Sequence, residues 1–500
     1  NAFAECISLT EVEIPDSVTT IGYSAFANCR NLSEVNLPKN LIELDGHAFL
    51  GCVKINSITI PRTLKTVNTM RGYWHNGIDR IIVDMGPFCN CTGLREVIIE
   101  DGTTKIANDL FATCTGLEKI IIPSTVTEIG NNAFKECISL TEVVIPDSVI
   151  TIGYSAFDGC RAWTDIVIPD KVATIKSFAF RNIAAEFISL PDSVTTLDDG
   201  VFSESKRLKE IKLPRTCEYI PQEAFANCTG LEKIVMPDTV TFIGASAFQN
   251  CTSLSEIGWS PALEIIYHRA FKNCHALKSV SIPNSVTKIY SQAFYDCDGL
   301  TDITIPDSVT DFGTYTFYDC DALVNASLGA GITEIPNSAF EHCNVLERVN
   351  IPRCVTSIAS NAFKDCVKFR EIHIPRSVTS IDSSAFSHPS NLTIYGVSGT
   401  YAETFAKENN IKFVDSQIHA TSAELSTRDL RIPKGSRQRL YLTVTPADFT
   451  DEVIWKASKP DIAYVDNTGL VSAKDVGIST IKVTVGSVTV SCKVTVYQPV

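Results

Sequence analysis

The sequence of 500 residues has no long apolar run and is short of basic residues. It contains 43 Lys and Arg against 57 Asp and Glu, for a net charge of −14. Nucleic acids and anionic membrane surfaces both require a basic face on the protein, so the composition argues against both partners. No apolar run approaches the roughly 18 residues needed to cross a bilayer. We therefore expect no membrane insertion in this segment.

The sequence patterns of common enzyme classes are also missing. The sequence contains no HExxH, no P-loop, no GxSxG and no GxGxxG in a strand-to-helix context. Its eight His are scattered over different parts of the chain, and no clustered CxxC-type spacing suggests a metal centre. We predict a protein that is not an enzyme, with no catalytic residues, no cofactor and no metal site.

What the sequence does contain is a repeat. The 23 residues AFANCRNLSEVNLPKNLIELDGH, from Ala25 to His47, return along the chain in the frame AFxxCxxLxxVxIPxxVxxIxxx. The anchor Phe of this frame occurs seventeen times, at Phe3, Phe26, Phe49, Phe88, Phe111, Phe134, Phe157, Phe180, Phe202, Phe225, Phe248, Phe271, Phe294, Phe317, Phe340, Phe363 and Phe386. One such unit cannot bury its own apolar face, so neighbouring units must stack into a solenoid.

The LxxVxI core of the frame is that of a leucine-rich-repeat strand. Its apolar residues point inward, and the polar residues between them point outward. We therefore predict an α/β-type leucine-rich-repeat solenoid with 23-residue repeats and short parallel strands on the concave face.

Cysteine follows the same period. Fourteen of the eighteen cysteines stand three residues after an anchor Phe: Cys6, Cys29, Cys52, Cys91, Cys114, Cys137, Cys160, Cys228, Cys251, Cys274, Cys297, Cys320, Cys343 and Cys366. One thiol per coil predicts an internal ladder in which Cys acts as a small buried hydrophobe. Ile183 and Ser205 take this position in two coils, which suits packing better than pairing. Rungs about 5 Å apart do not exclude a disulfide on distance alone, but we expect reduced thiols.

Two irregular steps interrupt the period. The step from Phe49 to Phe88 is 39 residues, which indicates an insertion near Arg62–Met85 that carries Tyr73 and Trp74. Insertions in solenoids form loops on one face, often a binding face; alternatively, the loop folds its aromatic residues back over the solenoid edge. The 22-residue step from Phe180 to Phe202 predicts one distorted coil.

The chain changes character after Phe386. Residues 388–414 predict a terminal cap, with a short helix over Tyr401–Asn409, Thr400 as its N-cap and a last strand over Ile411–Val414. Residues 1–414 would form the solenoid and 415–417 a hinge. Residues 418–500 contain short alternating strands separated by Pro and Gly, which predicts an all-β Ig-like sandwich.

Two columns of exposed residues flank the inward Val of the repeat strands. Nine of the fifteen residues assigned to the column before it are acidic, and these include Glu96, Glu142 and Asp165. We call this set the acidic column; it is either a binding face or a solvated face relieved by Lys residues. The column after the Val holds four successive aliphatic residues, which we call the apolar strip: Ile98, Ile121, Val144 and Val167. An apolar strip rimmed by carboxylates is typical of a protein-binding patch, although β-branched residues also favour strands.

Over about residues 1–414 the repeats resemble the BspA-like (Treponema pallidum-type) leucine-rich repeats of bacterial surface proteins. The resemblance rests on the frame AFxxCxxLxxVxIPxxVxxIG and on IYGVSGTYAETFAKENNIKFV, which looks like that family's usual ending. The region from Ile418 to Val496 is similar to a bacterial Ig-like group 2 domain. The matching segments are LTVTPAD, VIWKAS with Trp455, DIAYVDNTGLVSAKDVGISTIKV and VSCKVTV.

The resemblance implies an extracellular bacterial protein, secreted or attached to the cell surface, that binds partners by adhesion, with the Ig-like module as a stalk. We predict binding of a host or neighbouring-cell protein through the apolar strip, the acidic residues beside it and the loop around Tyr73–Trp74. The alternatives are a carbohydrate-binding or wall-associated scaffold, in which Trp74 stacks on sugars, and a structural display spacer. The chain begins inside a repeat and without Met, which suggests that it is part of a longer protein.

Overall fold

The computed structural model describes residues 1–68, 73–75, 80–82, 86–387, 391–446 and 449–498. By their contacts, these residues form two compact units. The first consists of Asn1–Ile303 with Asp311–Leu323, and the second of Thr304–Thr310 with Val324–Val500.

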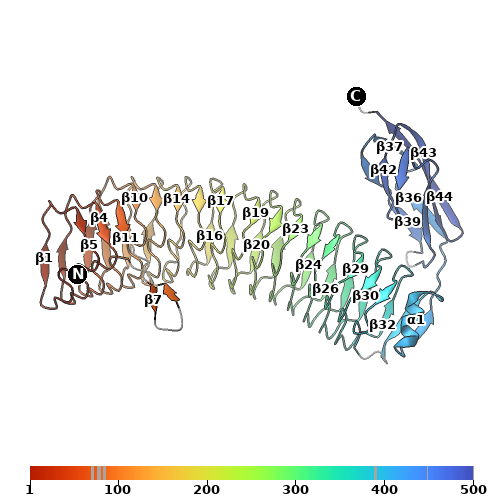
Figure 1. The fold of residues 1–500 in the computed structure, drawn as a ribbon, viewed down its shortest axis with the longest axis horizontal. Helices are drawn as coiled ribbons and strands as arrows, with labels where there is room; N and C mark the ends of the chain where they lie inside the picture. The colour runs from red at the N-terminus through yellow and green to blue at the C-terminus, as the bar shows by residue number, and fades with distance from the viewer. Residues whose placement is uncertain (69–72, 76–79, 83–85, 388–390, 447–448, 499–500) are drawn as a thin grey trace. The chain divides into compact units, whose positions relative to one another are not determined.

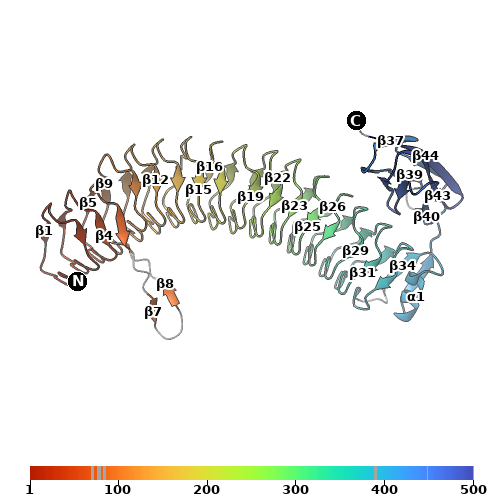
Figure 2. The same ribbon diagram turned by 45° about the horizontal axis from the view of Figure 1, so that its top comes forward.

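The first unit is a solenoid with two rows of short parallel strands (Figures 1 and 2). The first strand row contains the predicted repeat strands: β1 (Glu11–Glu13), β3 (Glu34–Asn36), β5 (Ser57–Ile60), β9 (Glu96–Ile99), β11 (Lys119–Ile121), β13 (Glu142–Val144), β16 (Phe187–Ser189), β18 (Glu210–Lys212), β20 (Lys233–Val235), β22 (Glu256–Gly258) and β24 (Ser279–Ser281). Pairing is parallel and advances one coil at a time, so that Lys119 lies beside Glu96 on one side and beside Glu142 on the other.

The second strand row was not predicted from the sequence. It is formed by the VxxI half of each repeat: β2 (Thr20–Ile21), β4 (Glu43–Asp45), β6 (Thr66–Asn68), β10 (Lys105–Ile106), β12 (Glu128–Ile129), β14 (Thr151–Ile152), β15 (Thr174–Ile175), β17 (Thr196–Leu197), β19 (Tyr219–Ile220), β21 (Phe242–Ile243), β23 (Ile265–Ile266), β25 (Lys288–Ile289) and β27 (Asp311–Phe312). Within the insertion, β7 (Tyr73–His75) and β8 (Arg80–Ile82) pair as an antiparallel hairpin.

The second unit continues with the same repeat and then changes fold. Strand β26 (Asp302–Thr304) bridges the two units in sequence. The repeat strands are β28 (Asn325–Ser327), β30 (Arg348–Asn350) and β32 (Glu371–His373) in the first row, and β29 (Glu334–Ile335), β31 (Ser357–Ile358) and β33 (Ser380–Ile381) in the second. Strands β34 (Thr393–Gly396) and β35 (Lys412–Asp415) extend the first row in parallel, which confirms the predicted last strand within one residue.

The predicted cap helix is present as α1 (Tyr401–Glu408), with Thr400 at the N-cap position. The Thr400 side chain makes no cap hydrogen bond to the helix. The Thr400 hydroxyl donates to the carbonyl of Val397, and Glu403 accepts the N–H of Gly399 instead. Because α1 is the one α-helix in the described residues and tight turns connect the strands, the α/β label fits only in part.

The C-terminal strands form an all-β module, as expected. They are β36 (Ser422–Leu425), β37 (Asp429–Pro433), β38 (Arg437–Arg439), β39 (Leu442–Thr445), β40 (Val453–Ala457), β41 (Ala463–Val465), β42 (Leu470–Ala473), β43 (Gly477–Val485) and β44 (Val488–Tyr497). They pair as sheets β37-β44-β43-β40, β38-β42-β41 and β36-β39. Cys492 is fully buried in the core that these sheets enclose, with Val494 and Val496 on the same face of β44.

The thiols form the predicted internal ladder, and the anchor Phe rings form a second ladder of stacked rings. Successive Phe rings stack with centroids 5.1–5.9 Å apart. Twelve ladder thiols donate a hydrogen bond of 3.0–3.3 Å to the carbonyl of the anchor Phe one coil earlier. Ser205 makes the same bond to Phe180. Cys and Ser thus supply a small donor at this position, which Ile183 lacks, and the structure places no cysteine in a disulfide.

The period of 23 fits only in part, and the distortion lies one coil earlier than predicted. The coil after Phe180 keeps its first-row strand, β16, whereas residues 163–169 carry no strand. Trp163 replaces the usual Leu there. Its buried indole N–H donates to the carbonyl of Asp165, so a backbone acceptor of that coil is occupied by a side chain.

The burial of the thiols leads to a prediction about their reactivity. Burial raises the pKa of Cys52 and Cys228 to about 12, and sixteen of the cysteines are buried, whereas Cys6 is exposed and Cys354 is half-buried. Because the thiolate is the reactive form, we expect the native protein at pH 8 to give one fast reaction with DTNB, from Cys6, and one slow reaction from Cys354. Cys6→Ser should remove the fast phase. Fast reaction of several thiols in the native protein would contradict the closed ladder.

Candidate apolar binding surface on the first strand row

The apolar strip is exposed, as the sequence predicted. The exposed fractions are 51% for Ile98, 60% for Ile121, 69% for Val144 and 74% for Val167. Ile121 pairs in register with Ile98 on one side and with Val144 on the other. These three side chains therefore stand next to one another on strands β9, β11 and β13, at the spacing of about 4.8 Å that separates paired strands.

Val167, the fourth residue of the strip, is placed differently from the other three. It is exposed, but it lies on the coil that has no first-row strand, so no strand pairing fixes it beside Val144. The cause is the indole of Trp163, which bonds to the backbone of the same coil. The structure thus brings three of the four predicted residues together in one sheet and leaves the fourth at its border.

The acidic residues beside the strip are placed as expected, but a lysine stands among them. Glu96 and Glu142 are exposed and flank Lys119 in register. The Lys119 ammonium lies 3.0 Å from the Glu142 carboxylate, and hydrogen bonding and charge from Glu142 raise the pKa of Lys119. Asp165 is exposed on the coil without a strand.

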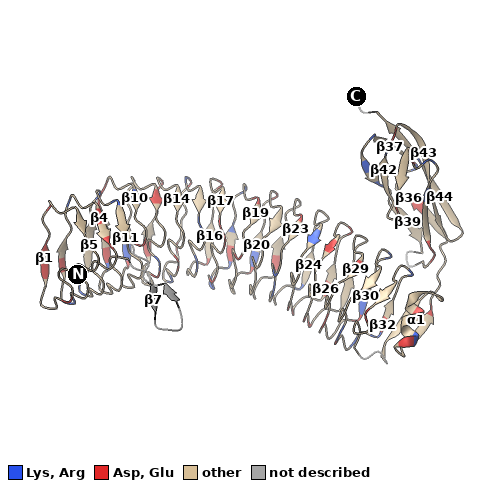
Figure 3. Cartoon of the chain, in the orientation of Figure 1, with Lys and Arg blue, Asp and Glu red and all other residues tan. Residues whose placement is uncertain are grey.

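A lysine also pairs with an acidic residue further along the first strand row. Lys233 pairs with Glu256 at 2.9 Å. Figure 3 shows acidic and basic residues mixed along the strands of the solenoid. The acidic column is therefore partly neutralised by its own lysines, which favours the strip over the column as the main contact surface.

The sequence analysis did not single out Phe187. This residue lies in β16, on the coil after the one that carries Val167, and is half exposed. It stands in the column that elsewhere holds mainly charged or polar residues and pairs in register with Glu210. The sequence does contain an aromatic residue here. Because this repeat departs from the 23-residue frame, the outward position of that residue could not be assigned from the sequence.

The predicted loop residues Tyr73 and Trp74 lie on β7, but their side chains are outside what the structure describes. Their part in binding stays a prediction.

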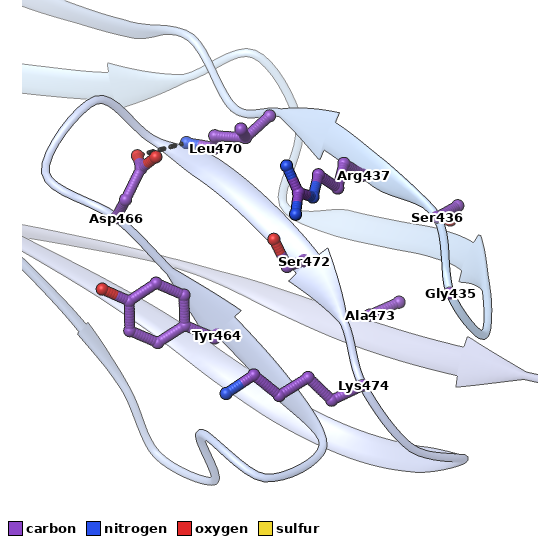
Figure 4. Close-up of a pocket in the computed structure, with 9 residues that line it drawn as sticks. All are labelled: Gly435, Ser436, Arg437, Tyr464, Asp466, Leu470, Ser472, Ala473 and Lys474. Carbon is purple, nitrogen blue, oxygen red and sulfur yellow. Dashed lines mark hydrogen bonds between the residues drawn. The ribbon is translucent and has the colours of Figure 1, made fainter.

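The C-terminal module has a shallow cavity of about 430 Å³. Figure 4 shows Tyr464, Lys474 and Arg437 around it, with the Lys474 ammonium 5.0 Å from the centre of the Tyr464 ring. Asp466 at its edge is held by its own turn. Burial alone would raise the Asp466 pKa, but hydrogen bonds from Thr468 and Leu470 lower it below the usual value. The carboxylate is thus engaged in turn structure and not directed at a ligand.

None of the helices in the described part of the chain is long and apolar enough to cross a membrane.

The parallel strands, stacked Phe rings and repeating turns define the class of solenoid built from leucine-rich repeats. The family model of the BspA type leucine rich repeat region matches residues 1–73, 81–209, 127–255 and 264–393, and the chain belongs to this family. The model of the bacterial Ig-like domain (group 2) matches residues 419–496. The boundary at 414 and the hinge at 415–417 lie between the two matches and stay predictions.

Solved structures of bacterial repeat proteins are similar to this chain. A leucine-rich repeat protein from Bacteroides ovatus is 27% identical over 62% of this chain and 87% of its own, with a TM-score of 0.56. A leucine rich cell surface protein from Faecalibacterium prausnitzii is 25% identical over 76% and 87%, with a TM-score of 0.34. The leucine rich repeat protein of T. pallidum is 26% identical over 39% and 82%, with a TM-score of 0.30. A search of curated proteins finds no match.

Both matched families are scaffold families. Leucine-rich-repeat solenoids of this kind present a repeated surface for contact with other proteins.

Proposed function

We propose that this chain is a non-enzymatic protein of the bacterial cell surface that binds another protein through the apolar strip. The observation that carries the proposal is the in-register exposure of Ile98, Ile121 and Val144 on three paired strands. Exposing three aliphatic side chains in a row is unfavourable in water, and burial against a partner would recover free energy of about 25 cal/mol per Å².

The surroundings of the strip fit a contact with a protein. A protein-binding patch has an apolar centre and a polar rim. Here the rim is formed by Glu96, Glu142 and the lysine between them. The partner would be a protein of a host or of a neighbouring cell, outside the producing bacterium, and the Ig-like module would serve as the stalk.

Substitution of the strip tests this proposal. We expect Ile121→Lys with Val144→Lys to weaken binding to an immobilised extracellular-matrix protein by at least about 100-fold, because each aliphatic side chain contributes roughly 1.5 kcal/mol or more when buried. Both side chains point to solvent, so the unfolding temperature should change little. Surface plasmon resonance on the full chain measures the first effect, and calorimetry the second.

Val235→Lys is the matched control. Val235 is 52% exposed and stands in the same column of the first strand row, but it lies between Lys212 and Gly258 and outside the strip. It should leave binding unchanged. If both variants weaken binding equally, or if binding falls steeply with salt as expected for exposed charges, the acidic column and not the strip is the contact. Binding to a glycan array that persists in the strip variant would favour the carbohydrate alternative.

A further inference from the structure

A ladder of Asn side chains ends abruptly inside the solenoid. The Asn227 amide donates to Glu204, Asn250 to Asn227, and Asn273 to Asn250, at 2.5–2.9 Å. Asp296 is the next rung, because its backbone N–H bonds to the following coil in the same way as that of Asn273. A carboxylate has no N–H to donate. The side-chain oxygen of Asn273 is accordingly buried with no hydrogen-bond partner.

His275 and Asp298 lie at the same place. They occupy equivalent positions of adjacent coils, each four residues after an anchor Phe. Nδ1 of His275 is shielded from solvent and lies 3.1 Å from a carboxylate oxygen of Asp298. The ligand atoms of His275, Asp296 and Asp298 all lie within 4.8 Å of one another. Three ligand atoms thus meet one rung beyond the last Asn of the ladder, whose side-chain oxygen has no hydrogen-bond partner.

A second cluster of the same kind has a lysine ammonium beside its carboxylates. Glu341, His342 and Asp365 also lie within 4.8 Å of one another. There the ammonium of Lys364 lies 2.6 Å from Glu341 and 4.0 Å from Asp365. In the first cluster the position equivalent to Lys364 is Tyr295, and the lysine of that cluster, Lys272, follows the anchor Phe of the earlier coil. Lys272 stacks 4.4 Å from the centre of the Tyr295 ring instead.

We propose that His275, Asp296 and Asp298, with the side-chain oxygen of Asn273 as a fourth ligand, bind one divalent cation of the Zn²⁺ type. An imidazole nitrogen with two carboxylates suits zinc and similar transition metals, whereas Ca²⁺ and Mg²⁺ prefer sites made of oxygen alone. Tetrahedral zinc with ligands at about 2.0–2.2 Å holds its donor atoms about 3.3 Å apart, so a small contraction of the cluster completes the site. The metal would tie two coils of the solenoid together.

Isothermal titration of the full chain with Zn²⁺ tests the site. A Cys6→Ser background removes the exposed thiol, which could bind zinc by itself. We expect one bound Zn²⁺ per chain, and at least a 10-fold loss of affinity in His275→Ala and in Asp298→Asn. Asp296→Asn should lose zinc equally while keeping its fold, because its new amide supplies the N–H that Asn273 lacks.

His342→Ala is the matched control, since Lys364 already accompanies the carboxylates of the second cluster. It should leave zinc binding unchanged. Equal zinc binding in the parent and in all three ligand variants would overturn the site. Ca²⁺ that competes with zinc at equal concentration, or zinc binding that survives in His275→Ala, would overturn the role of the imidazole. This test is independent of the binding surface proposed above, because the cluster shares no residue with the apolar strip.

Discussion

Phe157→Ala should destabilise the chain by about 3–5 kcal/mol, the usual cost of removing a buried Phe. The Phe157 ring is fully buried and stacks 5.2 Å from Phe134 and 5.7 Å from Phe180, and it also contacts Trp163 at 4.9 Å. Its loss opens a cavity between rings that belong to three coils. Because each coil of a solenoid is stabilised mainly by its neighbours, the cavity weakens two interfaces at once.

Phe3→Ala is the control for this prediction. Phe3 occupies the same repeat position, but it is half exposed and stacks on Phe26 alone. We expect its loss to cost less than about 1.5 kcal/mol. Urea unfolding followed by circular dichroism measures both values. Equal costs for Phe3→Ala and Phe157→Ala would show that burial in the ladder does not set the stability of a coil.

Arg181→Ala should cost about 2–3 kcal/mol, because it leaves the buried Asp158 carboxylate without its partner while the Arg181 side chain itself is 39% exposed. Asp158 is only 1% exposed, and Arg181 holds it with two hydrogen bonds of 2.8 and 2.7 Å. The hydrogen bond to Asp158 raises the pKa of Arg181. The variant would leave the carboxylate buried without its cation, and it would also lose the stacking of the guanidinium on Phe178.

The double variant Asp158→Ala with Arg181→Ala shows how much of the stability lost in Arg181→Ala comes from leaving the Asp158 carboxylate buried without a partner. Ala already follows the anchor Phe in other coils, as at Ala27, Ala112 and Ala226. We therefore expect the double variant to be more stable than Arg181→Ala alone by at least about 1 kcal/mol. Chemical unfolding of the wild type, the two single variants and the double variant gives all four values. A double variant as unstable as Arg181→Ala would mean that the stacking on Phe178 carries the loss.

The residues of the apolar strip were predictable wherever a position repeats with the coil. Ile98, Ile121 and Val144 fall at one position of successive repeats, and strands of a solenoid pair one coil at a time. Their exposure and adjacency follow from the period alone. The place of Val167 did not follow, because the indole of Trp163 interrupts the strand in that coil.

The His275 cluster was not predicted from the sequence. The eight His fall in different repeats, and no metal site was therefore expected. Residues 23 positions apart are neighbours in this fold, so a scattered pattern along the chain becomes a cluster across coils. Two features of the sequence could have revealed the cluster. Asp296 stands at the ladder position that Asn273 occupies one coil earlier, and His275 stands one coil before Asp298 at another repeat position.

The sequence by itself determined the solenoid, its Cys ladder and the exposed columns, because in a repeat each residue's neighbours are copies of itself. The short cap helix and the all-β module followed from their own capping, turn and strand patterns. Only the tertiary structure decided the second strand row, because its VxxI pattern repeats with the coil but its strands are only two or three residues long. It also decided which lysine forms an ion pair with a carboxylate, as Lys364 does, and which stacks on an aromatic ring, as Lys272 does. Those choices depend on the side-chain directions of individual residues, and the period does not specify them.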